Sequence, residues 1–179
     1  MTASTLAERL GDSSDHRSFL TSPRAASACR RELDRLNEEL SRRLTELQVA
    51  ESLEPFNVRA SLDRWIVQWG PVSLSVVWLQ TARDTVSDGE LLVIAWRGVA
   101  GRRLSQSAER SDASRLPSAI ALWEEVLAPI APDEASWAWM PRSAGENSPL
   151  WSSAELAAQC VQRLHAEYAR ALAEEPRAS

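Results

Sequence analysis

The side chains with the greatest capacity for chemistry in this 179-residue chain belong to two histidines and two cysteines. Nucleophilic catalysis requires a serine or cysteine within hydrogen-bond reach of a base, which is often a histidine. His16 lies in a polar leader, and His165 lies one residue off the apolar stripe of an expected C-terminal helix. Because neither histidine belongs to a recognisable nucleophile motif, the sequence predicts no catalytic residue and favours a protein that is not an enzyme.

Residue spacing gives no support to a metal or cofactor site. A structural zinc site needs ligands that converge, as in a CxxC motif or a Cys/His cluster, and Cys29 and Cys160 are far apart in the chain. No glycine-rich loop of the GxGxxG or GxxxxGK[ST] kind is present to hold a phosphate. The sequence therefore predicts no metal and no cofactor. Both cysteines fall on apolar helical stripes, which predicts buried, inert thiols.

Two adjacent arginines are the first candidate for a binding site. Arg102 and Arg103 follow two glycines in a polar segment, residues 98–114, that we expect to be a loop. Guanidinium groups bind phosphates and carboxylates in a bidentate manner, and loops often carry binding residues. The alternative is a solvated loop, because all twenty basic residues are arginines, a bias typical of a GC-rich bacterial genome.

Eight tryptophans, against one tyrosine and two phenylalanines, form the second unusual feature. We expect most of them in the core, although each buried indole N–H requires a hydrogen-bond partner. Tryptophan is also enriched at binding hot spots. Trp137 and Trp139 share one face of a strand expected at residues 136–140, beside a Pro- and Ser-rich segment. These two are therefore the predicted binding pair, and core packing is the alternative.

Two long amphipathic helices are expected to position these residues. The first begins at Ser22-Pro23, runs to about Leu53 and carries an apolar stripe at the helical period. The second begins at Ser152, and Glu155, three residues later, completes a capping box. Its stripe repeats every four residues, through Leu156, Cys160, Leu164, Tyr168 and Leu172.

The chain between these helices has the character of strands. Alternating or apolar runs separated by short turns, such as Gly70-Pro71 and Asp88-Gly89, indicate an antiparallel meander rather than βαβ units. The expected strands cover residues 57–61, 65–69, 72–79, 91–96 and 136–140. The spacing of Ile120, Trp123 and Leu127 predicts a shorter helix over residues 117–127. The predicted fold is α+β: an antiparallel sheet of four to five strands packed by the two long helices.

Composition sets the expected context of this fold. We expect one domain over residues 21–175, after a disordered leader, residues 1–20, and before a frayed tail, residues 176–179. The sequence lacks a signal peptide and a long apolar run, which favours a cytoplasmic protein that does not enter a membrane. A net charge of −5 argues against binding to nucleic acid.

Three hypotheses for function remain open. The first is a protein-interaction module, such as an accessory subunit, adaptor or chaperone-like protein, that binds a protein partner or itself. It would act through the N-terminal helix, which at about 40 Å exceeds a sheet of roughly 20 Å, and through the Trp-bearing sheet surface. The second is a binding module for a small anionic ligand, with a Trp-lined pocket closed by the arginine loop. The third is an enzyme whose catalytic residues form no motif.

Overall fold

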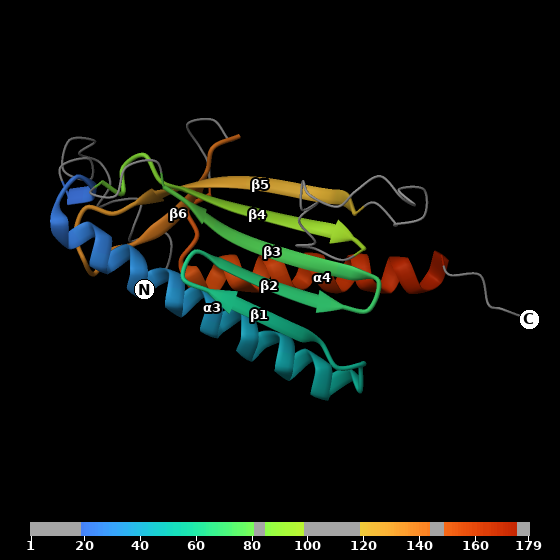
Figure 1. The fold of residues 1–179 in the computed structure, drawn as a ribbon. Coiled ribbons are helices and arrows are strands. Elements are labelled where there is room, and N and C mark those ends of the chain that lie inside the picture. The colour runs from blue at the N-terminus through green and yellow to red at the C-terminus, as the bar shows by residue number, and fades with distance from the viewer. Residues whose placement is uncertain (1–18, 81–84, 99–118, 144–148, 175–179) are drawn as a thin grey trace, which may run out of the picture.

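The computed structural model of the chain describes residues 19–80, 85–98, 119–143 and 149–174. Among these residues lie a six-stranded sheet and two long helices that pack on the same side of it (Figure 1). The predicted α+β class is confirmed, although the sheet has six strands rather than four to five. The predicted leader lies outside the described residues except for Phe19 and Leu20, and the predicted tail lies outside them entirely.

The first long helix, α3, spans Pro23–Glu51 and confirms the N-terminal helix expected from the apolar stripe. Proline suits its first turn, where a backbone N–H has no helical partner. The helix ends at Ser52, whose left-handed backbone places its N–H on the carbonyl oxygen of Gln48. The stripe faces the interior, with the buried residues Ala25, Ala28, Cys29, Leu33, Leu36, Leu40 and Leu44.

The six strands form a meander in which each strand pairs antiparallel with the next along the chain. Two-residue turns at residues 62–63 and 70–71 join the first three strands, and only antiparallel strands can be joined in that way. The strands are β1 (Asn57–Ser61), β2 (Arg64–Trp69), β3 (Val72–Leu79), β4 (Glu90–Arg97), β5 (Ile120–Ile130) and β6 (Ala138–Pro141).

The helix predicted over residues 117–127 is wrong, because this part of the chain forms most of β5. Strand β5 pairs with β4 on one side and with β6 on the other. Backbone hydrogen bonds from two neighbouring strands therefore replace the internal hydrogen bonds of a helix.

A β-bulge explains why β5 resembles a helix in sequence. The pairing of β4 with β5 shifts register after Ala95, which leaves Leu122 as an extra residue on β5. The shift brings Ile120 and Trp123, three residues apart, to the same face of the sheet, and Leu127 follows two strand periods later. The resulting spacing of three and then four residues matches the period of a helix.

One face of the sheet, which we call the inner face, packs against the helices and forms the core. The predicted alternation is confirmed, because Trp65, Val67 and Trp69 of β2 are all buried on this face. Strand β3 contributes Val72, Leu74, Val76 and Trp78 to the same cluster. Each of these side chains removes apolar surface from water, which stabilises the fold by roughly 1.5–3 kcal/mol for a fully buried large side chain.

The second long helix, α4, spans Ser153–Glu174. Its predicted capping box is confirmed: the backbone N–H of Ser152 donates to the Glu155 carboxylate at 2.8 Å, and the Ser152 hydroxyl accepts from the Glu155 N–H at 3.3 Å. Just before the helix, Trp151 forms a β-bridge with Trp139 of β6. The chain therefore turns back along the sheet edge before α4 begins.

Because the chain reverses once more between β6 and α4, at the bridge of Trp151 with Trp139, helices α3 and α4 run in the same direction. Near the start of both helices, the Ser153 hydroxyl donates to the carboxylate of Glu32 at 2.8 Å. Further along both, Nε2 of His165 lies 3.0 Å from the carboxylate of Glu51. The two contacts follow the same order along each helix, as the parallel course of the ribbons in Figure 1 also shows.

Candidate functional site

The structure describes two of the four predicted binding residues. Arg102 and Arg103 lie outside the described residues. Trp137 and Trp139 lie together, with their ring centroids 5.7 Å apart in an edge-to-face arrangement. Both indoles are in the core, with exposed fractions of 5% and 0%. A binding role for this pair stays a prediction, and in this structure the two side chains act as packing residues.

The ring contacts of Trp139 show how the pair is held. Its indole and that of Trp78 lie edge to face at a centroid distance of 6.0 Å, and its N–H donates to the hydroxyl of Ser153 at 3.1 Å. That hydroxyl in turn donates to Glu32 of α3. A chain of polar contacts therefore connects the sheet edge to both helices, which satisfies the buried indole N–H.

The two cysteines are buried and unpaired, as the helical stripes predict. Burial raises the pKa of both Cys29 and Cys160 from 9.0 to about 12, because the interior disfavours a thiolate. The parallel helices also separate the two thiols. Cys29 lies three residues before Glu32 and Cys160 seven after Ser153, an axial offset of about 15 Å. A disulfide joins Cα atoms that are only about 4.4–6.8 Å apart, so these cysteines cannot form one without rearrangement.

His165 contacts residues of the sheet and of α3. Its ring stacks on Trp69 at a centroid distance of 6.0 Å, and its Nε2 contacts Glu51 at the end of α3. These contacts join α4 to the end of α3 and to the sheet. Within the described part of the chain, no group of three potential metal ligands converges. In the same part of the chain, neither helix is long and apolar enough to span a membrane.

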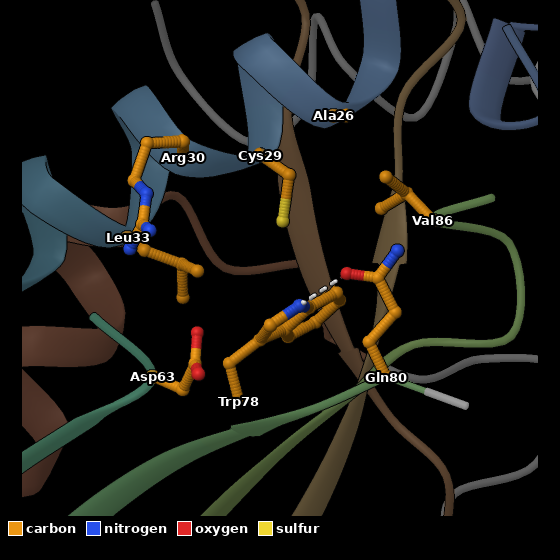
Figure 2. A pocket seen from close by; sticks show the side chains of 8 residues that line it. All are labelled: Ala26, Cys29, Arg30, Leu33, Asp63, Trp78, Gln80 and Val86. Atoms are coloured by element: carbon orange, nitrogen blue, oxygen red, sulfur yellow. Dashed lines mark hydrogen bonds between the residues drawn. The ribbon is translucent and has the colours of Figure 1, made fainter. Parts of the chain in front are cut away.

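A small pocket lies between α3 and the end of β3. It has a volume of about 130 Å³, and Figure 2 shows Cys29 and Leu33 pointing from α3 toward the indole of Trp78. Binding sites for drug-sized ligands have volumes of about 300–1,000 Å³, so this pocket could accept only a very small molecule.

The polar groups of the pocket give it no preference for an anion. The guanidinium of Arg30 donates to the backbone carbonyl of Leu62, and the carboxylate of Asp63 lies on the same side of the pocket. The indole N–H of Trp78 donates to Gln80 at 3.2 Å. Since charges of both signs are present, the anionic-ligand hypothesis stays a prediction that these residues do not strengthen.

The second candidate site is the outer face of the sheet, which is the face opposite the two helices (Figure 1). Its side chains do not belong to the core cluster, and no described helix or strand packs over them. The apolar members at its centre are half-buried, except for Ile94, which is buried with an exposed fraction of 9%. They are Ile66, Val77, Leu92, Ile94, Trp96 and Val126.

The polar side-chain atoms of Ser73, Ser75 and Trp96 on the outer face form hydrogen bonds within the chain. The hydroxyl of Ser73 donates to the carbonyl oxygen of Gly98 at 3.1 Å, so it needs no external partner. The indole N–H of Trp96 donates to the Ser75 hydroxyl at 3.0 Å, which lays the ring along the sheet. The polar atoms of these three side chains are therefore paired inside the chain, and the indole adds apolar surface to the face.

A signal for this face is present in the sequence. Residues 91–96 are apolar at consecutive positions, a pattern typical of a strand covered on both faces. In the structure only one face of β4 is covered by helices. The second apolar set of this strand therefore marks a surface that is built like a core but has no described covering element.

The comparisons with known proteins give no family. No protein-family model, no curated protein and no solved structure matches this chain.

Proposed function

We propose that this chain is a non-enzymatic protein-interaction module that binds its partner through the outer face of the sheet. The observation that carries the proposal is a group of apolar, mostly half-buried side chains on the outer face of β2, β3, β4 and β5, over which no described helix or strand packs. Exposed apolar patches of a few hundred Å² on soluble domains commonly mark interaction sites. An accessory subunit, an adaptor and a chaperone-like protein all work through a surface of this kind.

The sheet surface is a better candidate than the long N-terminal helix. Helix α3 buries its apolar stripe from Ala25 to Leu44 inside the chain, against the sheet and α4. Only its last turn carries an exposed large apolar side chain, Val49, with an exposed fraction of 74%. A single apolar residue makes fewer contacts with a partner than the six apolar side chains of the outer face. The proposal includes a cytoplasmic location, because both described cysteines are unpaired, as in a reducing compartment.

Capture of partners from the source cell can test the site with three baits: the wild type, Leu92→Glu on the outer face and Val49→Glu at the end of α3. A buried charge opposes association, so we expect Leu92→Glu to lose any specifically bound protein and Val49→Glu to retain it. Val126→Glu serves as a second outer-face variant, and circular dichroism checks that each bait is folded. Retention by both folded outer-face variants, or loss with Val49→Glu alone, would contradict the proposed site.

A further inference from the structure

We propose that the partner of the outer face is a second copy of this chain, packed sheet to sheet about a two-fold axis along β3. The inference rests on the proposed function and adds the identity of the partner and the register of the contact.

A row of five residues across the outer face carries the argument. Each residue pairs with the next on the neighbouring strand, so all five lie on one face and in one line. From β1 to β5 the row reads Arg59, Ile66, Ser75, Ile94 and Glu124. A positive charge stands at one end, a negative charge at the other, and two isoleucines flank a small residue at the centre.

The charges at the ends of this row cannot satisfy each other within one chain. Four strand spacings of about 4.8 Å separate Arg59 from Glu124, a distance of about 19 Å. Both side chains are exposed, and neither makes an ion pair with any residue in the described ranges. The row is thus complementary to a copy of itself in the reverse order.

A two-fold axis parallel to the strands and above Ser75 produces that reverse order. It places Arg59 opposite Glu124 of the second copy, Ile66 opposite its Ile94, and Ser75 opposite its own equivalent. This is an isologous contact, in which the same surface on both copies is self-complementary. An axis across the strands would instead place Arg59 opposite its own equivalent, and the like charges would repel.

The dimensions of sheet packing allow the charged contacts to form. Packed sheets lie about 10 Å apart, and arginine and glutamate side chains together bridge roughly that distance. Aligned sheets cross at about 30°, which shifts the two ends of the row by about 5 Å, within the reach of an arginine. In the next row, Val77 faces its equivalent, and Leu92 faces the aliphatic stem of Arg64 in the second copy.

The size of the face indicates a reversible dimer. It measures roughly 24 Å across five strands and about 26 Å along an eight-residue strand, a footprint of about 600 Å². Stable complexes of standard size bury about 800 Å² on each partner. The face therefore lies near the lower limit for specific association, and we expect a dissociation constant in the micromolar range.

Charge reversal combined with sedimentation velocity tests the proposed register. We expect the wild type to pass from monomer to dimer between about 1 and 200 µM. Each of Arg59→Glu and Glu124→Arg turns two attractions into two repulsions, so each should raise the dissociation constant about tenfold or more. An equal mixture of these two variants should recover the wild-type affinity, because opposite charges again meet at both ends. Arg24→Glu and Glu38→Arg make the same charge changes on the surface of α3 and should leave the dimer unaffected.

Several results would overturn this inference. A wild type that stays monomeric over the whole range removes the second copy as partner. Equal loss in the α3 controls would show a net-charge effect, and failure of the mixture to recover would show a different register. The proposed function is tested separately: if the wild type is monomeric but Leu92→Glu still abolishes capture of another protein, the proposed function holds and the face binds a different partner. If both folded outer-face variants retain the captured protein, the proposed function fails.

Discussion

Replacement of Gly89 by alanine tests how closely the chain packs around Trp78. A Cβ atom at position 89 would lie 2.2 Å from both Cη2 and Cζ2 of the indole and 3.1 Å from the carbonyl oxygen of Val86. Contacts of 2.2 Å are far inside van der Waals distance, so the ring has to move. It has little room to do so, because Trp78 is only 8% exposed and its ring packs against that of Trp139.

Two effects of opposite sign determine how far Gly89→Ala changes the free energy of unfolding. Gly89 does not have a positive φ, so alanine can adopt its backbone conformation. By itself this would stabilise the fold by about 0.4–1 kcal/mol, because alanine restricts the unfolded chain. Overpacking a core costs about 1–3 kcal/mol. We expect overpacking to dominate, with a net loss of about 1–2 kcal/mol and a Tm lower by roughly 2–8 °C for a chain of this length.

Thermal and urea unfolding of four proteins provide the measurement: the wild type, Gly89→Ala, Trp78→Phe and the double variant. Phenylalanine lacks the two ring atoms that meet the new Cβ, so Gly89→Ala should cost little or even stabilise the protein in that background. The double-mutant cycle should give a coupling of about 1–2 kcal/mol. A rise in Tm for Gly89→Ala alone, or an equal cost in both backgrounds, would refute the packing argument.

Two further predictions concern the helices. Native Cys29 and Cys160 should react negligibly with a thiol reagent at pH 8, and both should react once urea unfolds the chain; rapid native labelling would contradict their burial. Because the folded pKa of each thiol is raised from 9.0 to about 12, its contribution to stability is present below pH 9. This contribution should be lost as the pH rises to about 12, as urea melts can show. Ser153→Ala removes a buried hydroxyl between β6 and α3 and should cost about 1–3 kcal/mol, more than the roughly 1 kcal/mol of Ser152→Ala at the helix cap. Equal costs in urea melts would contradict this order.

The helices and the inner face could be predicted from the sequence because each depends on a local period. The stripe of α3 repeats at three and four residues, and the cap of α4 needs only Ser152 and Glu155. The alternation of Trp65, Val67 and Trp69 likewise gives one strand face without reference to other strands. Such patterns predict the element correctly because burial of one apolar face contributes most of the free energy that stabilises it.

The features that the sequence did not predict depend on which strands pair and in which register. The bulge at Leu122 depends on β4, so β5 alone has the spacing of a helix. The row from Arg59 to Glu124 exists only after four antiparallel pairings have formed. The strand pattern alone predicts a free face for Trp139, yet Trp151 pairs beside it and its indole donates to Ser153 of α4. A local pattern contains none of these relations.

The packing of α3 against α4 has a consequence for synthesis of the chain on the ribosome. The leucine stripe of α3 leaves the ribosome early, while α4, which covers part of it, is the last described element made. At roughly 5–20 residues per second, translation of the approximately one hundred residues between these helices takes about 5–20 s. During that time the nascent chain displays an uncovered amphipathic helix, a typical target for chaperones. A chain released before Ser153 would keep that stripe exposed, so quality control can recognise truncated products from their first helix.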